Sequence, residues 1–154
     1  MAERFHVQGL EGVQEKLQAI GDIKIVKRIV RKASRQAMNI VRDAARNNAK
    51  AIDDPATVEM IHKNITVSGG RTKDKRNLKM RVGIKGGASQ NQHSVSTAGL
   101  SGGDTRHWRY IEFGKSNVPA VPFMRPALAN NIDAVTNKFT EVLNDEIDKA
   151  LAAL

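Results

Sequence analysis

The chain has 154 residues, a length that supports one folded domain around a single hydrophobic core. Hydrophobic residues make up 40% and charged residues 27%, and no run approaches the roughly 20 apolar residues of a membrane-spanning helix, which excludes a membrane protein. The absence of cysteine excludes disulfides, thiolate metal sites and a cysteine nucleophile, and it fits a reducing cytoplasm. The charged start, MAERFHVQG, predicts no secretory signal.

The net charge of +9 is distributed unevenly along the chain. Residues 22–52 carry nine basic and two acidic side chains, whereas residues 122–154 carry three basic and five acidic ones. A basic face attracts nucleic acid through phosphate neutralisation, and it attracts an acidic protein surface through the same Coulomb forces. Charge alone therefore leaves both kinds of partner open.

The first half of the sequence predicts two helices. Apolar residues at helical spacing over residues 10–20, closed by Gly21, indicate a short amphipathic helix. A much longer helix is predicted for residues 22–52, with Asp22 as its N-cap and a length of about 45 Å. Its apolar side chains, many of them alanine, fall within an arc of about 120°. The opposite side carries nine basic residues: Lys24, Lys27, Arg28, Arg31, Lys32, Arg35, Arg42, Arg46 and Lys50.

The middle of the sequence predicts a small sheet and a loop. Residues 57–62 fit one or two helical turns, and residues 65–68 alternate like a strand. The clear alternation of residues 78–84 predicts a second strand, which pairs with the first as an antiparallel hairpin with a long basic tip. Residues 85–104 are rich in Gly, Ser, Gln and Asn, which predicts a flexible loop whose paired glycines are flexible loop ends.

The last part of the sequence predicts mainly helix. Residues 107–114 fit a helical turn or a strand, and the turn is favoured. Pro119 and Pro122 punctuate an extended linker, and apolar residues at spacings of three and four indicate a long amphipathic helix from residue 124 onward. The fold class is therefore α+β. We expect a single domain over residues 1–154, in which a small antiparallel sheet packs against the long amphipathic helix and the C-terminal helix completes the core.

The sequence offers little support for catalysis. Its four histidines, at positions 6, 62, 93 and 107, lie in unlike segments and lack the spacing of zinc enzymes. Ser101, Asp104 and His107 stand close together, but a glycine-rich loop does not hold a nucleophile rigidly beside its base. We therefore expect no enzymatic activity, no metal and no cofactor. A small hydrolase remains a rival hypothesis.

The basic stripe on the long helix has two interpretations. Such a stripe is often a solvated face, but nine cations almost without interleaved acids lack the alternating charges that stabilise exposed helices. An acidic surface is therefore expected opposite, and the C-terminal helix offers Asp133, Glu141, Asp145 and Asp148. Between assembled copies, this contact would be heterologous and would close into a ring.

The most specific pattern is YIEFGKSNVPAVPFMRPA at residues 110–127. It resembles the tail-completion, or head-tail joining, proteins of lambda-like long-tailed bacteriophages. Their run has an aromatic residue, Glu-Phe-Gly-Thr, a proline-containing linker and Pro-Phe-Leu-Arg-Pro-Ala. Residues 112–114 match the first block, and residues 122–127 match the second, with Lys115 and Met124 in place of the usual Thr and Leu. The order of the other elements is also similar, although the loop at 85–104 is longer than expected.

This resemblance implies a structural virion protein that forms a ring, of six copies by analogy, at the head-proximal end of the tail and completes it for head-tail joining. The implied partners are other copies of the chain, tail terminator and tail tube proteins, head connector proteins, and phage DNA passing through the lumen. The implied location is the tail or neck of the virion, after assembly in the host cytoplasm. A tail terminator and a sequence-independent nucleic-acid-binding protein that uses the helix arginines, Arg46 included, are the alternatives.

The residues of the motif also have a physical interpretation. Gly114 permits a backbone turn, and the prolines stiffen the start of the last helix, where Pro126 is tolerated in the first turn. Glu112 and Arg125 are placed to form an ion pair, and two phenylalanines are expected to pack this corner. The predicted subunit interface comprises Arg28, Arg31, Arg35, Arg42, Glu112, Phe113, Gly114, Pro122, Phe123, Arg125 and Pro126.

Overall fold

The computed structural model describes residues 7–88 and 96–154. Those residues form helices together with a two-stranded antiparallel sheet, which confirms the predicted α+β class. In chain order, the elements are α1 (Val13–Ile20), α2 (Ile23–Lys50), α3 (Ile61–Asn64), β1 (Ile65–Gly70), β2 (Lys79–Ile84), α4 (Trp108–Phe113), α5 (Met124–Ala129) and α6 (Ile132–Ala152).

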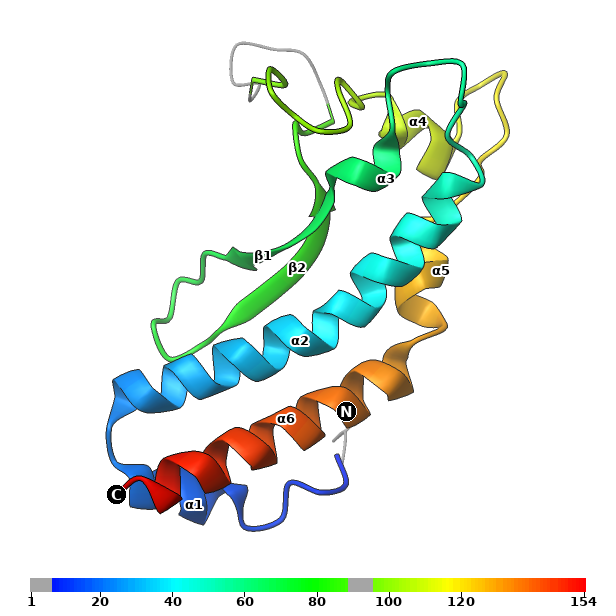
Figure 1. Ribbon diagram of the computed structural model, residues 1–154. Helices are drawn as coiled ribbons and strands as arrows, with labels where there is room; N and C mark the ends of the chain where they lie inside the picture. The colour runs from blue at the N-terminus through cyan, green and yellow to red at the C-terminus, as the bar shows by residue number, and fades with distance from the viewer. Residues whose placement is uncertain (1–6, 89–95) are drawn as a thin grey trace.

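Helix α2 is the central element of the fold. Its start is fixed by Asp22, whose Oδ1 accepts a hydrogen bond of 2.7 Å from the backbone N–H of Lys24, as the N-cap prediction requires. The β1–β2 hairpin lies along one side of α2 and α6 along the other (Figure 1). A row of fully buried alanines, Ala33, Ala37, Ala45 and Ala49, allows these neighbours to approach the helix closely.

Two hydrophobic clusters lie along α2. Near the start of α2, Ile29 and Ala33 pack with α1 and with Val142, Leu143 and Ile147 of α6. Near its end, α2 packs against α3, β1 and α5 through a cluster composed of Val41, Ala45, Ala49, Ile61, Ile65, Phe123 and Ala127. Burial of this apolar area supplies the main stabilising free energy of the fold, and α2 contributes to both clusters.

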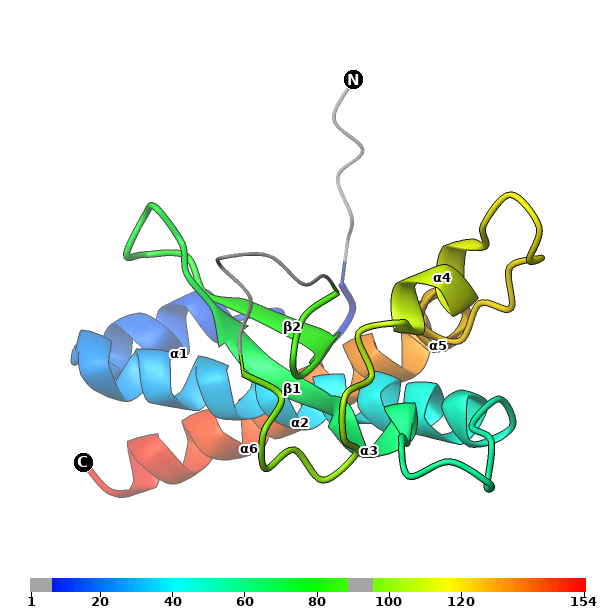
Figure 2. The same cartoon turned by 90° about the horizontal axis from the view of Figure 1, so that it is seen from above.

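The hairpin follows the predicted alternation. Strands β1 and β2 pair in an antiparallel register that runs from Ile65 opposite Ile84 to Gly70 opposite Lys79. The first strand continues two residues beyond the predicted end at Ser68, because Gly69 and Gly70 still pair with Met80 and Lys79. Figure 2 shows the tip of the hairpin, residues 71–78, projecting from the body of the protein.

Two predicted helices differ from the observed ones. The helix expected over residues 57–62 begins only at Ile61, because the preceding residues form turns and bends. The single C-terminal helix is divided into α5 and α6 at residues 130–131, where the Asn131 side chain donates to the carbonyl of Ala127 at 2.8 Å. On either side of this break, Leu128 and Ile132 are half exposed rather than buried as the continuous pattern predicted.

The flexibility predicted for the loop at 85–104 stays a prediction, and residues 89–95 lie outside the described residues. The end of the segment is anchored to α3, where the buried Asn64 side chain accepts from the N–H of Gly102 at 3.0 Å and donates to the Gly103 carbonyl at 3.0 Å. The Gly102 carbonyl in turn accepts from the N–H of Met60 at 2.8 Å. Gly102, where a Cβ would lie 2.2 Å from the Met60 carbonyl oxygen, is therefore a packing position.

Replacing Gly102 with alanine should destabilise the protein. A Cβ at this position would lie 2.2 Å from the Met60 carbonyl oxygen, so the backbone must shift, at a cost of about 1–3 kcal/mol. The measurement is the free energy of unfolding from urea titration. Gly69→Ala is the matched control, because a Cβ there meets nothing within 4 Å. Equal stability of the two variants would contradict the packing role of Gly102.

Candidate functional site

The corner between α4 and α5 is organised by the carboxylate of Glu112, which is 1% exposed. Its Oε2 accepts from the backbone N–H groups of Phe123 at 2.7 Å and Met124 at 2.9 Å, and its Oε1 accepts from the N–H of Arg125 at 3.0 Å. These donors are among the N–H groups at the start of α5 that have no partner within the helix. We call residues 108–129 the Glu112 corner.

The predicted ion pair between Glu112 and Arg125 is present. The Arg125 Nε donates to Glu112 Oε1 at 3.1 Å, and its Nη2 donates to the Glu112 backbone carbonyl at 2.6 Å. Burial by itself raises the pKa of Glu112, but the hydrogen bonds from the backbone of residues 123–125 and from the Arg125 side chain outweigh it, so the pKa lies below its usual value. Glu112 is therefore held as a carboxylate.

The segment between the two helices forms a rigid projection. Gly114 has a φ of +76°, which favours glycine, and a Cβ there would lie 3.0 Å from Val118 O and from Ala120 N. Lys115 and Val118 exchange two backbone hydrogen bonds of 2.9 Å, and the N–H of Val121 donates to the Ile111 carbonyl at 2.8 Å. Figure 2 shows this segment, residues 114–122, standing away from α2 beside α4.

The outer surface of the corner exposes apolar side chains beside the basic side chains of Lys115 and Arg125. Tyr110, Phe113, Val118 and Val121 are each about half exposed, and we call these four residues the corner rim. Arg125 stacks over the Phe113 ring, with its guanidinium carbon 5.0 Å from the ring centroid. Grouped exposed apolar side chains on a rigid frame are typical of a protein–protein contact surface.

The predicted interface residues of the corner divide into two groups. Glu112 and Phe123 are buried within the protomer, so they can shape a contact surface but cannot touch a neighbouring subunit. Phe113 was expected to pack the junction with Phe123, yet it is 57% exposed, because the α4 face that carries it points outward. Pro122 is exposed and Pro126 is half-buried in the first turn of α5. Their role between subunits stays a prediction.

The predicted interface arginines of α2 also fall into two groups, those that are exposed and those that have partners within the protomer. Arg28, Arg31 and Arg35 are exposed, as predicted. Arg42 pairs with Asp43 at 2.8 Å, and Arg46 donates from Nε and Nη2 to the Ile65 carbonyl at 3.0 and 2.7 Å. Arg42 and Arg46 therefore already have partners within the protomer.

Part of the expected acidic partner surface is supplied by the same chain. Lys32 of α2 pairs with Glu146 of α6 at 2.9 Å, and Lys16 of α1 pairs with Asp148 at 2.8 Å. The sequence reasoning named Asp148 but missed Glu146. These pairs join α1 and α2 to α6, and they lower the number of acids available to a neighbour.

A basic groove lies between the first half of α2 and the hairpin tip. It has a volume of about 410 Å³ and contains six basic side chains, two from α2 and four from the hairpin. These groove cations are Lys27, Arg31, Arg71, Lys75, Arg76 and Lys79. The sequence predicted a basic tip and a basic helix, but nothing in the local patterns indicated that the two would face each other.

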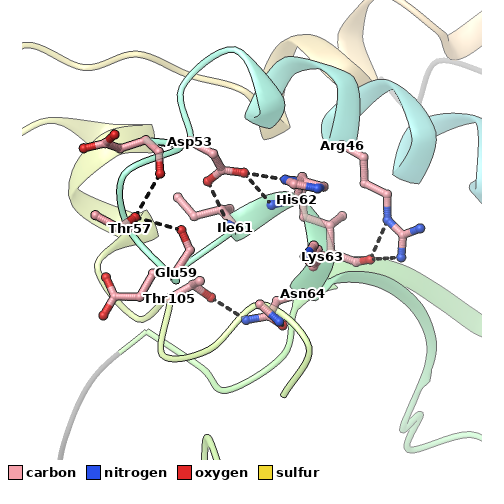
Figure 3. Close-up of polar contacts among 12 residues, drawn as sticks. Arg46, Asp53, Thr57, Glu59, Ile61, His62, Lys63, Asn64 and Thr105 are labelled. Atoms are coloured by element: carbon pink, nitrogen blue, oxygen red, sulfur yellow. Dashed lines mark hydrogen bonds and ion pairs between the residues drawn. The ribbon is translucent and has the colours of Figure 1, made fainter. Parts of the chain in front are cut away.

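A second polar cluster surrounds Asp53 and His62, which the sequence reasoning did not connect (Figure 3). Asp53 Oδ1 accepts from the N–H of Ile61 at 2.8 Å, and Oδ2 lies 2.6 Å from His62 Nδ1. Asp53 therefore fixes the start of α3. The hydroxyl of Ser101, on the neighbouring surface, donates to the Lys63 carbonyl at 3.3 Å, which commits it to the backbone.

Two observations bear on metal and membrane binding. Within residues 7–88 and 96–154, no group of three or more His, Asp or Glu side chains is arranged to hold a metal ion. Across the same described residues, no helix combines the length and apolarity needed to cross a membrane.

Comparison with known proteins identifies the family. The model of the family described as "Bacteriophage HK97-gp10, putative tail-component" matches residues 11–114, more than half of the chain. The chain therefore belongs to this HK97-gp10-like family of phage tail components, as the resemblance predicted. The match contains Glu112 to Gly114 and ends before the second motif block at residues 122–127. No curated protein and no solved structure matches the sequence.

Replacing Glu112 with glutamine should destabilise the fold. The neutral amide has one acceptor oxygen and offers an N–H₂ group to backbone donors, so at least one buried N–H loses its partner, at a cost of about 1–3 kcal/mol. Urea unfolding measures the difference. Glu141→Gln is the control, because Glu141 forms an exposed pair with Lys138 and should change stability by less than about 0.5 kcal/mol. Equal losses in the two variants would contradict the role assigned to Glu112.

The contribution of Glu112 should also depend on pH. Since its folded-state pKa lies below the usual 4.5, the stabilisation is complete above about pH 4.5 and is lost as the pH falls through the folded-state pKa. The difference in unfolding free energy between wild type and Glu112→Gln should therefore narrow progressively below pH 4.5. Unfolding titrations of both proteins at a series of pH values measure it. A constant difference down to acid unfolding would be inconsistent with a capping carboxylate.

Proposed function

We propose that this protein forms a homo-oligomeric ring at the head-proximal end of the phage tail and completes the tail for joining to the filled head. Membership of a phage tail-component family is the observation that carries this proposal. The finer role comes from the head-tail joining motif at residues 110–127. The same motif builds a rigid corner with an exposed apolar rim, which is a surface suited to contact with another subunit.

The proposed assembly mechanism is heterologous contact. In a closed ring, each subunit presents one surface to the next and receives a different surface from the previous one. The corner rim would be the apolar part of such a contact, and the exposed cations Arg28 and Arg35 remain candidates for a charged part. Six copies is the ring size that the motif resemblance implies. Glu112 and Phe123 would act by holding the rim in place.

The proposed partners follow from this position in the virion. The ring would contact tail terminator and tail tube proteins on one side and head connector proteins on the other, with phage DNA passing through its lumen. Assembly would take place in the host cytoplasm before the protein becomes part of the tail or neck. We propose that this role requires no catalysis and no cofactor, because the free energy of binding between subunits is sufficient for assembly.

Replacing Val118 with aspartate should prevent assembly while the monomer stays folded. Val118 is 52% exposed at the tip of the projecting segment, so the substitution costs little in the monomer but buries an unpaired charge in the proposed contact. The measurements are mass determination of the protein alone and with tail tubes, and head-tail joining yield in complementation.

Val58→Asp is the matched control, because Val58 is 89% exposed in the segment between α2 and α3, outside the corner rim. It should assemble like wild type. Unchanged assembly of Val118→Asp would reject the corner rim as the contact surface. A wild-type protein that stays monomeric with tail tubes and is absent from virions would reject the ring itself.

A further inference from the structure

The basic groove collects positive charge from two elements that are far apart in the sequence. Helix α2 supplies Lys27 and Arg31, and the hairpin supplies the other four groove cations. Half of the twelve lining residues that the structure describes are basic, and none of the twelve carries a carboxylate. Like charges brought this close repel one another, and an anionic ligand would relieve this repulsion.

Within residues 7–88 and 96–154, the groove cations have few acidic partners. Among the residues that the structure describes, Arg76 is the one groove cation that forms an ion pair, with Asp74 at 3.5 Å. The Arg76 side chain is 88% exposed, so this pair is screened by water and contributes little. The other five form no ion pair with the rest of the described chain, which favours their availability to a ligand.

The backbone of the hairpin tip is braced by hydrogen bonds, which constrains the backbone positions from which its basic side chains extend. The hydroxyl of Thr72 lies 2.9 Å from the carbonyl oxygen of Asp74 and 3.0 Å from that of Asn77, and the N–H of Arg76 donates to Asp74 Oδ1 at 2.8 Å. A pre-organised set of donors loses less conformational entropy on binding than a flexible one.

The composition of the lining indicates what kind of anion fits. None of the described lining residues is aromatic, so they offer no stacking platform for nucleotide bases. The lining instead contains Lys, Arg, Thr and Asn, the side chains that hydrogen-bond to phosphate and sugar oxygens. A chain of phosphates matches this surface better than an exposed base does.

The acidic face of a second copy is a poorer match. Of the acids on α6, Glu141 pairs with Lys138, Asp148 with Lys16, and Glu146 with both Lys32 and Lys149. Within the described residues, this leaves Asp133 and Asp145 without an ion pair. The five acids of α6 are thus partly neutralised within the protomer before they would face six cations, whereas nucleic acid supplies a negative charge at every nucleotide.

We propose that the basic groove binds the sugar–phosphate backbone of double-stranded DNA without reading its base sequence. Only the source of the DNA rests on the proposed function: it would be the phage genome near the head-proximal end of the tail. It assigns Arg31 to DNA and not to a neighbouring subunit. The binding itself requires only the folded chain.

Binding of the purified full-length protein to fluorescein-labelled duplex DNA tests this proposal. Wild type should bind two duplexes of unrelated sequence equally at about 50 mM salt, and its affinity should fall steeply as salt is raised. In the double variant Arg71→Glu and Lys75→Glu, the affinity should fall about ten-fold or more. The salt slope should decrease by about two, because two phosphates are no longer neutralised. Both residues are exposed in the hairpin tip, so the fold should persist.

The matched control is Lys50→Glu with Lys63→Glu, which changes net charge by the same amount at exposed positions outside the groove. This control should bind DNA within about three-fold of wild type, because it loses only long-range attraction. Equal losses in the two double variants, or no binding by wild type at about 50 mM salt, would overturn the proposal.

The assembly assay separates this proposal from the proposed ring. The groove variant should still form rings with tail tubes, because its corner rim is unchanged. Loss of assembly with unaltered DNA affinity would overturn the proposal and identify the groove as a contact between proteins. Conversely, DNA binding that depends on the groove in a chain that never assembles would reject the ring and leave the groove proposal intact.

Discussion

The geometry of the C-terminal third of the protein depends on one buried carboxylate. Glu112 is placed by α4, and its hydrogen bonds to three consecutive backbone N–H groups fix where α5 begins and in which direction it runs. A buried charge is costly unless it is fully hydrogen-bonded, and here the same donors are ones that the helix start leaves without partners. The same three hydrogen bonds therefore offset both the cost of burying the Glu112 carboxylate and the cost of leaving the backbone N–H groups unpaired. The favourable orientation of the α5 dipole adds to this effect.

The position of Glu112 in turn determines what the surface presents. Phe123, fully buried, anchors the start of α5 in the cluster formed with the end of α2, and the Asn48 side chain of α2 donates to the Phe123 carbonyl at 3.1 Å. With both ends held, the projecting segment can expose its apolar rim without being flexible. A surface of this kind loses little conformational entropy on binding, which favours a specific contact over non-specific aggregation.

Local patterns in the sequence predicted the elements well where the physical cause is local. The cap at Asp22, the alanine-lined face of α2 and the alternation of β2 each depend on neighbouring residues, and each is present in the structure. The Glu112–Arg125 pair was predicted because both residues belong to one short motif. The break at residues 130–131 was missed because the apolar spacing continues across it, although Leu128 and Ile132 do not become buried.

Features that depend on distant segments could not be predicted in the same way. A glycine that packs against a carbonyl, such as Gly102, has the same sequence signature as a glycine in a flexible loop, and only the position of Met60 distinguishes them. The pairing of Asp53 with His62 depends on how the chain returns after α2. The basic groove depends on the side of α2 on which the hairpin lies, which hydrophobic periodicity does not specify.

The two surfaces proposed for function lie at opposite ends of α2. Lys27 and Arg31, in its first half, contribute to the basic groove, whereas the Glu112 corner packs against its second half (Figure 1). Along α2, the 14 residues from Arg31 to Ala45 span about 21 Å, more than twice the Debye length of about 8 Å at physiological ionic strength. Charges in the groove consequently exert little direct force on the corner rim. In the proposed ring, a subunit could therefore contact DNA at one end and another protein at the other, without one contact electrostatically weakening the other.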